Sequence, residues 1–243
     1  MIYTRSMEKK QLNTFVLSVG GSVFAPYSSG KIDIDYLKAF EAFIRKQVAL
    51  KRRFFIVTGG GYTARQYRDA AAQAVGTKLT DEDLDWLGIH ATRLNAHLFR
   101  TLFRDIAYEK ILKHYDLVDK KIDQPVVICG GWQPGWSTDY DSVLIAHDYE
   151  VDTVINLSNV DMVYDADPKT NPAAKPLTKL SWDELISIVG KDWKPGMNTP
   201  FDPIASKMAK QIGLKVIVCN GKNFVNLEKI LSGESNYVGT TIE

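Results

Sequence analysis

The stretch VICGGWQPGWSTDYDS, at positions 127–142, gathers residues that could bind a ligand or take part in a reaction. An apolar run leads into two glycines, two tryptophans, a Pro-Gly pair, three serine or threonine hydroxyls and two aspartates. Glycine has the most permissive backbone, so such a loop can bend to enclose a ligand. The alternative is that Trp132 and Trp136 are ordinary core or interface residues.

Glycine turns recur after other apolar runs in the chain. The runs that end in glycine or Asn-Gly are Phe15–Val19, Phe54–Thr58, Val126–Cys129 and Val216–Cys219. Such runs are typical of buried strands in a parallel sheet, and ligands bind beyond the carboxyl ends of those strands. There, glycine lets the backbone approach a phosphate, and a following helix adds free N–H groups. A glycine pair can also merely tighten a turn, but its recurrence favours a phosphate site.

The segment TGGGYTARQYRDAA, at 58–71, fits the looser dinucleotide fingerprint but lacks its context. That fingerprint needs a second strand with an acidic residue about 20 residues on, whereas this segment is followed by polar residues and more helix. A Walker A loop is also excluded, because Gly30-Lys31-Ile32 lacks the hydroxyl residue and the preceding glycine. The glycines of this segment can still surround a phosphate with backbone N–H groups. Arg65, one helical turn further on, could donate two parallel hydrogen bonds to that phosphate, or it could be a solvated arginine on the helix surface.

A second polar stretch, NLSNVDMVYDADP at 156–168, also follows an expected strand. Its carboxylates and amides suit Mg²⁺ and ribose contacts near a phosphate loop, and Tyr164 could lie against a base. The same stretch could be an ordinary Asx-rich turn.

Strands alternating with helices must position these loops, which favours an α/β sandwich. A fifth strand is expected at Thr153–Leu157. In the first half of the chain, helices are expected at 34–48, with Asp33 as N-cap, at 62–75, and at 83–114 as one long helix or two, with Leu94 among the apolar positions. In the second half, a Ser181/Glu184 capping box is expected to open a short helix, and a further helix is expected at 202–211, ending at Gly213.

The composition is that of a globular protein, with 243 residues, 45% hydrophobic residues, 24% charged residues and a net charge of +1. This charge gives no reason to expect nucleic-acid or anionic-membrane binding. Cys129 and Cys219 are expected as buried thiols. The absence of a long apolar segment or signal-peptide core makes the cytoplasm the default location. Residues 1–13 are expected to be a flexible extension.

Six motifs together resemble the UMP kinases of the amino acid kinase family, most closely their archaeal type. They are SVGGSV (18–23), TGGGYTARQY (58–67), LGIHATRLNAHL (87–98), GGWQPGWSTD (130–139), NVDMVYDADPKTNPAAK (159–175) and DPIASK (202–207). The resemblance implies a three-layer αβα sandwich around a largely parallel sheet and transfer of the γ-phosphoryl of ATP to UMP with Mg²⁺ carried by ATP. It also implies a homohexamer, and one domain over 14–243 with a UMP lobe (14–125) and an ATP lobe (126–243).

The resemblance also implies roles for individual residues. On the UMP side it places Gly60, Asp85, Trp132, Gln133, Pro134, Gly135, Trp136, Ser137 and Thr138. On the ATP side it places Gly21, Ser22, Gly61, Arg65, Ser158, Asn159, Tyr164 and Asp167. Asp139 and Asp202 match acidic positions that organise the reacting groups, and Lys207 or Arg65 would supply the catalytic cation.

The chain departs from the family pattern at several of these places. Ser18 stands where many relatives carry a lysine beside the transferred phosphoryl group, and Tyr140, Asp141 and Ser142 replace a run of small residues. Met162 replaces a glycine, and Trp132 is bulkier than usual. Two alternatives therefore stay open: a kinase of the same superfamily with another acceptor, and a non-catalytic nucleotide- or oxyanion-binding or storage protein on this fold.

Overall fold

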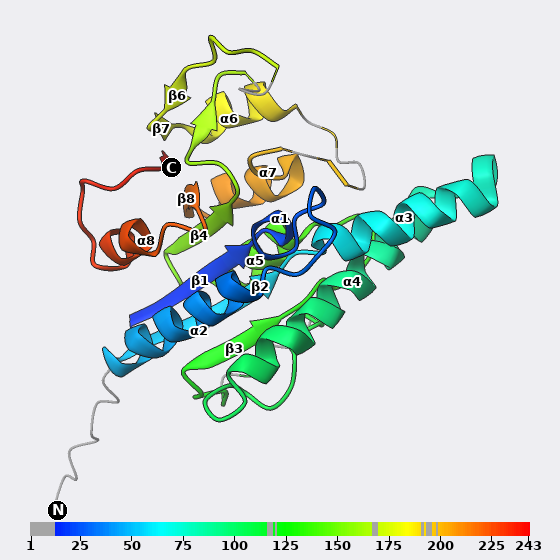
Figure 1. Ribbon diagram of the computed structural model, residues 1–243. Coiled ribbons are helices and arrows are strands. Elements are labelled where there is room, and N and C mark those ends of the chain that lie inside the picture. Colours follow the sequence, from blue (N-terminus) through cyan, green and yellow to red (C-terminus); the bar gives the residue numbers. More distant parts are fainter. Residues whose placement is uncertain are drawn as a thin grey trace, which may run out of the picture.

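The computed structural model describes residues 13–115, 119, 121–166, 170–190, 192, 196–197 and 199–243. Its centre is a seven-stranded sheet in the order β3-β2-β1-β4-β8-β9-β7, with helices on both faces (Figure 1). The expected three-layer αβα sandwich with a largely parallel sheet is confirmed. The sheet runs without a break from the strands of the first half of the chain into those of the second.

Five parallel strands form the body of the sheet, and all five were predicted. They are β1 (Asn13–Val19), β2 (Arg52–Thr58), β3 (Val126–Cys129), β4 (Thr153–Ser158) and β8 (Lys215–Asn220). Side chains at alternate positions of each strand enter one of two hydrophobic cores, so a continuous apolar run is needed to fill both faces. Cys129 and Cys219 are buried free thiols, as expected.

Short strands that the sequence did not predict complete the sheet. β9 (Thr240–Ile242) runs antiparallel to β8, and β7 (Lys179–Leu180) runs parallel to β9. A separate two-stranded ribbon joins β5 (Val163–Tyr164) to β6 (Pro176–Leu177). Runs of two or three residues are too short to show a strand period, so pattern alone does not detect them.

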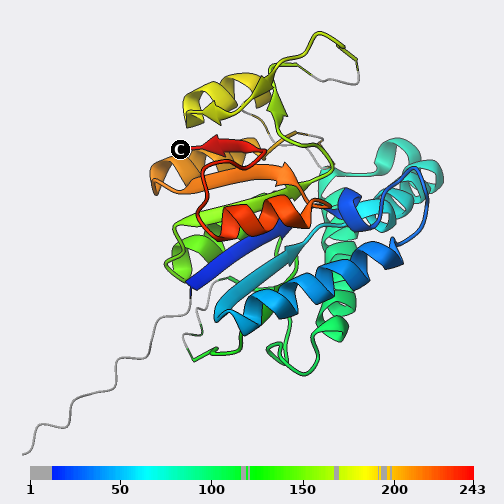
Figure 2. The ribbon, with the colours of Figure 1, turned by 60° about the vertical axis from the view of Figure 1, so that its left-hand side comes forward.

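Helices cover both faces of the sheet. On one face lie α1 (Gly21–Phe24), α2 (Ile34–Ala49), part of α4 (Asp81–Leu102) and α8 (Phe224–Leu231), and Figure 2 shows α2 and α8 against the strands. On the other face lie α5 (Thr138–Asp148), α6 (Trp182–Val189) and α7 (Pro203–Gln211). The remaining helix, α3 (Gly61–Val75), packs against α4 and is followed by a 3₁₀ turn, Gly76–Lys78.

The expectation of helix through 83–114 was wrong at its C-terminal half. Helix α4 begins earlier, at a Thr80/Asp83 capping box, and ends at Leu102. The chain then runs beside β3, where the Tyr108 N–H donates to the Val126 carbonyl and the Leu112 N–H to the Ile128 carbonyl. These bonds occupy the free edge of β3, so sheet pairing overrides the apolar periodicity that had suggested helix.

The buried face of α4 also differs from the predicted one. Leu94 is 62% exposed, whereas the buried positions are mostly small or polar residues, including Gly88, Ala91, Thr92 and Asn95. Small residues let α4 lie close to α3 and to the strand tips. The expectation from large apolar side chains was therefore wrong at Leu94, although Leu98 and Leu102 do pack against the core.

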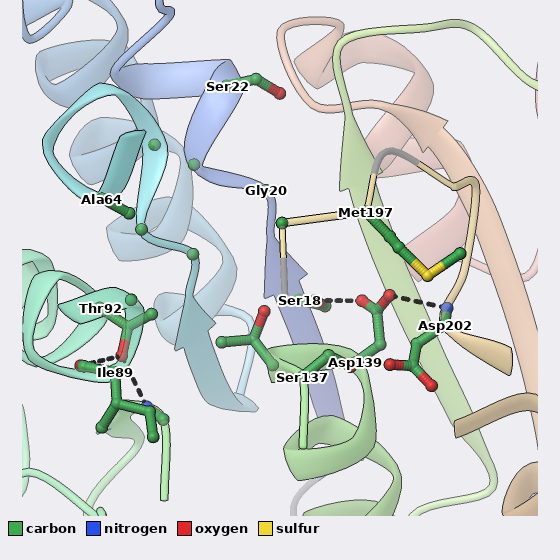
Figure 3. A pocket seen from close by; sticks show the side chains of 18 of the residues that line it. Ser18, Gly20, Ser22, Ala64, Ile89, Thr92, Ser137, Asp139, Met197 and Asp202 are labelled. Carbon is green, nitrogen blue, oxygen red and sulfur yellow. Dashed lines mark hydrogen bonds between the residues drawn. The ribbon is translucent and has the colours of Figure 1, made fainter. Parts of the chain in front are cut away.

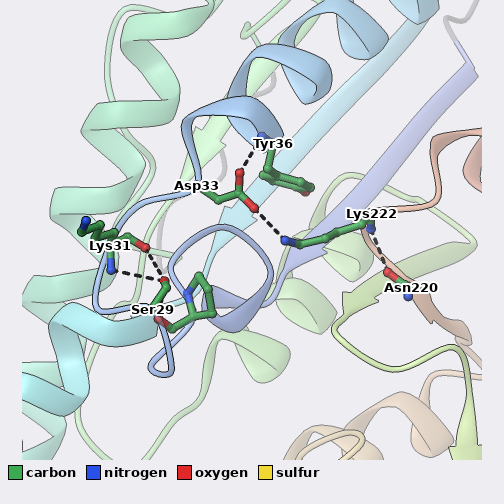
Figure 4. Close-up of polar contacts among 7 residues, drawn as sticks. Ser29, Lys31, Asp33, Tyr36, Asn220 and Lys222 are labelled. Atoms are coloured by element: carbon green, nitrogen blue, oxygen red, sulfur yellow. Dashed lines mark hydrogen bonds and ion pairs between the residues drawn. The ribbon is translucent and has the colours of Figure 1, made fainter.

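Asp33 joins two segments that are far apart in the sequence (Figure 4). One carboxylate oxygen accepts a hydrogen bond from the Tyr36 backbone N–H, which confirms Asp33 as the N-cap of α2. The other accepts from Lys222 Nζ at 2.7 Å, and this bond holds the pKa of Asp33 below its usual value. The start of α2 is thereby tied to the turn after β8.

Asp33→Ala should lower the free energy of unfolding by about 1–2 kcal/mol, because both the cap and the ion pair are lost. Asp33→Asn keeps a capping oxygen and should cost less than half as much. Urea unfolding of the wild type and both variants measures this. Equal losses in the two variants would contradict the capping role.

Candidate functional site

The glycine turns after β1 and β2 lie in direct backbone contact. The Gly59 N–H donates to the Val19 carbonyl at 2.9 Å, and the Tyr62 N–H donates to the Ala25 carbonyl at 2.8 Å. A Cβ atom added to Gly21 would lie 2.0 Å from the backbone nitrogen of Gly61. No side chain larger than hydrogen fits there, so glycine is required for the two turns to meet.

A cleft of about 230 Å³ opens in front of these turns. Its walls come from both glycine turns, the facing surfaces of α3 and α4, the N-terminus of α5 and the residues before α7 (Figure 3). Many of the residues predicted for the site lie in these walls. They are Gly21, Ser22, Gly60, Gly61, Arg65, Asp85, Trp136, Ser137, Thr138, Asp139 and Asp202.

Other predicted residues lie outside the walls of this cleft. Trp132, Gln133, Pro134 and Gly135 belong to the loop behind it, Ser158, Asn159 and Tyr164 lie at and beyond the tip of β4, and Lys207 is an exposed residue of α7. Asp167 falls outside the described residues. The predicted residues therefore lie partly in or behind the walls of one cleft and partly in a neighbouring segment beyond β4.

A chain of hydrogen bonds links Ser18, Asp139 and Asp202 across the floor of the cleft (Figure 3). Ser18 Oγ donates to Asp139 Oδ1 at 3.3 Å, and the Asp202 backbone N–H donates to Asp139 Oδ2 at 3.1 Å. Burial of the Asp139 carboxyl and the nearby charge of Asp202 together raise the pKa of Asp139 to about 7, while the hydrogen bonds from the Asp202 N–H and Ser18 oppose the shift. The two carboxyl groups thus share one buried, electronegative site.

Helix capping fixes the position of both carboxyl groups. Asp202 is the N-cap of α7, where its Oδ1 accepts from the N–H groups of Ile204 and Ala205. Burial raises the pKa of Asp202, whereas the bonds to the helix N–H groups lower it. Its Oδ2 is buried without a hydrogen-bond partner of good geometry among the described residues. Asp139 lies in the first turn of α5, which Ser137 caps.

The loop between β3 and α5, which carries Trp132 and Trp136 and is called the tryptophan loop below, is anchored to α4. The Gly135 N–H, at a residue with φ of +84°, donates to Asp85 Oδ2 at 2.7 Å. Arg93 donates to the carbonyls of Gly131 and Trp132 at 2.9 and 2.7 Å. Asp85 is therefore a loop anchor as well as a wall residue.

The two indoles of this loop occupy different places. Trp132 packs edge-on against Tyr115, at 5.7 Å between ring centroids, and against Trp136 at 4.8 Å. Only Trp136 of the pair reaches the cleft wall. Trp132 is half-buried and packs against one hydrophobic core, whereas Trp136 lines the cleft.

A second, shallower hollow lies near the tips of β4 and β8. Asn220, Lys222 and Val225 are in its wall. The Gly221 N–H donates to the Ser158 carbonyl at 2.8 Å, and Asn220 Nδ2 donates to Asp161 Oδ1 at 2.9 Å. The segment predicted for the ATP side thus borders this hollow.

Sequence reasoning missed two polar residues of α4 that hold the glycine turns. Asn95 Nδ2 donates to the carbonyls of Gly59 and Gly60 at 2.8 and 3.1 Å. Thr92 Oγ1 accepts from the Gly131 N–H at 2.8 Å. Both residues belong to the LGIHATRLNAHL motif, but only the tertiary contacts show which backbone groups they bind. Arg68, also missed, lies one turn beyond Arg65 and lines the cleft.

The model of a known family, "Amino acid kinase family", matches residues 13–220. The chain belongs to the amino acid kinase family. It is 34% identical over 230 residues to a uridylate kinase of Pyrococcus abyssi, covering 94% of this chain and 98% of that protein. It is also 34% identical to a uridylate kinase of Sulfurisphaera tokodaii, with 94% and 98% covered.

Solved structures agree with this membership. A crystal structure of uridylate kinase from Archaeoglobus fulgidus is 34% identical, with a TM-score of 0.77, and the match covers 95% of this chain and all of that one. A UMP kinase structure from Bacillus anthracis, at 23% identity and a TM-score of 0.74, shares the fold. Within the described part of this amino acid kinase, no helix is long and apolar enough to cross a membrane.

Asp141 belongs to the run of residues 140–142 that was expected to depart from the family pattern. It is fully buried behind the cleft, and neither carboxyl oxygen has a partner of good hydrogen-bond geometry among the described residues. Burial raises its pKa well above the usual value, while the Trp132 N–H and the Arg93 guanidinium lower it. The folded protein therefore favours the neutral acid at this position.

Asp141→Asn should stabilise the protein more at pH 8 than at pH 5. Because the pKa of Asp141 is raised on folding, the folded state retains a proton that the unfolded chain loses above about pH 4, and wild-type stability falls as pH rises. The side-chain amide of the Asp141→Asn variant does not titrate, so the stability of the variant lacks this pH dependence. Melting temperatures of the wild type, Asp141→Asn and the exposed control Asp152→Asn at both pH values test this; a pH-independent difference for Asp141→Asn would contradict it.

Gly21→Ala should separate the two glycine turns, because its methyl group would collide with the Gly61 backbone. We expect the affinity of the cleft for its ligands, and any reaction that takes place in the cleft, to fall at least a hundredfold. Gly76→Ala is the control, because Gly76 does not line the cleft and nothing lies within 4 Å of the added Cβ; its φ of +64° adds a backbone strain that Gly21 does not have. Ligand-induced shifts in melting temperature measure the loss; a wild-type response in Gly21→Ala would show that the contact is dispensable.

Proposed function

We propose that this protein is a uridylate kinase, which transfers the γ-phosphoryl group of ATP to UMP and yields UDP and ADP. The observation that carries the proposal is the backbone contact between the glycine turns of β1 and β2 at one cleft. Two phosphorylated molecules can meet end to end there. The full-length similarity to uridylate kinases supports UMP as the acceptor.

Within this proposal, the turn after β1 and the turn after β2 hold different phosphates. Gly21 and Ser22 would contact the ATP phosphates, Gly60 the phosphate of UMP, and Gly61 the groups between the two nucleotides. The free N–H groups at the start of α3 add a positive dipole end on the acceptor side. Phosphoryl transfer chiefly requires alignment and neutralisation of spreading negative charge, which fixed backbone donors supply without a covalent intermediate.

The UMP lobe, 14–125, and the ATP lobe, 126–243, would each supply part of its nucleotide's site, and residues of both lobes line the cleft between the two nucleotides. Asp85, Trp136, Ser137 and Thr138 would surround UMP, with Trp132, Gln133, Pro134 and Gly135 shaping the loop behind it. Ser158, Asn159 and Tyr164, beside the hollow between β4 and β8, would contact the adenosine of ATP.

Mg²⁺ carried by ATP fits the acidic groups of this cleft. The described residues contain no group of three or more metal-ligating side chains. Mg²⁺ in kinases is commonly held by one or two carboxylates together with substrate phosphates. The Oδ2 of Asp202, which has no hydrogen-bond partner of good geometry among the described residues, offers such a ligand. When bound, the ion would neutralise charge on the transferred phosphoryl group.

Asp139 and Asp202 would organise the reacting groups from the floor of the cleft. Asp139 orients the Asp202 backbone through their hydrogen bond, and Asp202 fixes the start of α7. Arg65 lines the cleft, and Lys207 acts on Asp202 by its charge, which lowers the pKa of that carboxyl. Because serine at position 18 cannot neutralise charge, the substrate-borne ion and the arginines would have to do so.

Purified protein should release ADP from Mg-ATP with UMP at a rate well above that with CMP, acetylglutamate or carbamate. Asp139→Asn should lower kcat with UMP by at least a hundredfold, because an amide cannot provide the negative charge of the acidic pair. Asp183→Asn, at an exposed residue of α6, is the control and should behave as wild type.

The same assay separates the alternatives. Turnover with a carboxylate or carbamate acceptor in place of UMP would indicate another kinase of the superfamily. ATP binding without turnover on any acceptor would favour a non-catalytic nucleotide-binding protein, for which Ser18 in place of lysine is the motivating observation.

We further propose that the protein works in the cytoplasm as a homo-oligomer, with a hexamer expected from the family resemblance. Tyr67, Val75, Trp86 and Leu94 supply exposed apolar surface on α3 and α4 that an interface could cover. Light scattering after size-exclusion chromatography measures the number of subunits.

A further inference from the structure

Arg68 is an arginine of the cleft wall that the family motifs did not single out. It lies on α3, three residues after Arg65, so both side chains leave neighbouring positions of the same helix face. Its Nε donates to the Leu84 carbonyl of α4 at 2.9 Å, which fixes the direction of the guanidinium. The side chain is half-buried and lines the cleft.

The guanidinium lies directly over the backbone of Gly88. A Cβ atom added to Gly88 would lie 2.2 Å from Arg68 Nη2 and 3.0 Å from its Cζ, and one added to Gly196 would lie 2.9 Å from Nη1. Glycine at both positions leaves room for the guanidinium. Among the described residues, no group accepts a hydrogen bond from Nη1 or Nη2, so both remain available to a ligand.

Gly88 in turn lies beside the turn proposed for the acceptor phosphate. A Cβ atom added to Gly60 would lie 3.6 Å from the Gly88 carbonyl oxygen and 3.7 Å from the Ala91 Cβ. Gly60, Gly88 and the Arg68 guanidinium are therefore consecutive neighbours along one wall. An anion held by the Gly60 turn would lie near the unpartnered nitrogens of Arg68.

Arg65 is placed differently from Arg68. Its residue is exposed, and its Cζ lies 5.7 Å from the centroid of the Tyr27 ring, itself an exposed side chain. Arg68 is more deeply set, and burial lowers its pKa while nearby Asp85 raises it. An arginine remains protonated in either position, so a partly desolvated charge with free donors favours an anionic partner.

We propose that Arg68 binds the phosphate of the acceptor nucleotide and, with Arg65, forms a two-arginine clamp for that dianion. The inference rests on the proposed function, because it assigns a new residue to the acceptor side of the same cleft. A planar guanidinium with two free nitrogens can give a phosphate two parallel hydrogen bonds. The chemical class recognised is a phosphate monoester, such as a nucleoside 5′-monophosphate.

Arg68→Met tests the clamp, because methionine preserves much of the apolar stem but removes every donor. The KM for UMP should rise about 10- to 100-fold, the size expected for lost charge-assisted hydrogen bonds, while the KM for ATP changes less than threefold. Arg68→Lys should recover only part of the loss, since an ammonium is a point charge rather than a fork.

The matched control is Arg100→Met. Arg100 lies on α4 outside the cleft wall, and its Nε also donates to a backbone carbonyl, that of Glu109, at 2.7 Å. The Arg100→Met variant therefore shows the effect of losing a side-chain-to-backbone hydrogen bond from an arginine that does not contact the phosphate. Its KM for UMP should equal that of wild type.

Two binding measurements distinguish a phosphate contact from the other outcomes. UMP should raise the melting temperature of wild type and Arg100→Met but not of Arg68→Met, whereas the inhibition constant of uridine, which lacks the phosphate, should change less than threefold in Arg68→Met. An unchanged UMP response in Arg68→Met would overturn the proposal and leave Arg68 as a brace between α3 and α4. Equal losses for uridine and UMP would overturn it in favour of a nucleoside contact.

Failure of the proposed function gives a different result. Wild-type protein that neither phosphorylates UMP nor is stabilised by it would contradict the uridylate kinase proposal, and the clamp with it. Wild-type turnover together with a normal Arg68→Met would contradict the clamp alone.

Discussion

The site depends on the close approach of two glycine backbones, at Gly21 and Gly61. Adjacent parallel strands bring the turns after β1 and β2 together, but only the absence of a side chain lets their backbones touch. The contact aims the N–H groups of two successive strand-to-helix turns at one space. Parallel sheets generally leave a crevice beyond the strand tips, and this contact shapes that crevice into the cleft proposed to hold two phosphorylated molecules.

Polar residues of α4 maintain this arrangement from behind. Asn95 satisfies the carbonyls of the β2 turn, Thr92 holds the turn after β3, and Asp85 holds Gly135 of the tryptophan loop. Each of these bonds replaces water around a buried backbone group, which would otherwise destabilise the fold. The helix that packs with small residues thereby also positions the cleft.

The floor of the cleft combines charge and burial. Asp139 and Asp202 are enclosed there, Asp141 is buried behind them, and burial raises the pKa of each. Like charges in a low-dielectric setting favour protonation until cations arrive, so the Mg²⁺ proposed to enter with ATP would change the charge state of this floor on binding. Arg65 and Arg68 add positive charge to the cleft wall, where we propose that they hold the acceptor phosphate.

The sequence by itself determined the five central strands, the caps at Asp33 and Ser181, and most of the motifs that line the cleft. These features are encoded by local patterns, namely buried apolar runs, capping side chains and glycine turns. It did not determine the end of α4, the packing of Trp132 against the core, the separation of Lys207 from the cleft wall or the placement of Arg68 over Gly88. Those features depend on contacts between residues far apart in the chain, because only tertiary packing decides which side of a helix meets the sheet and which polar atoms line the cleft.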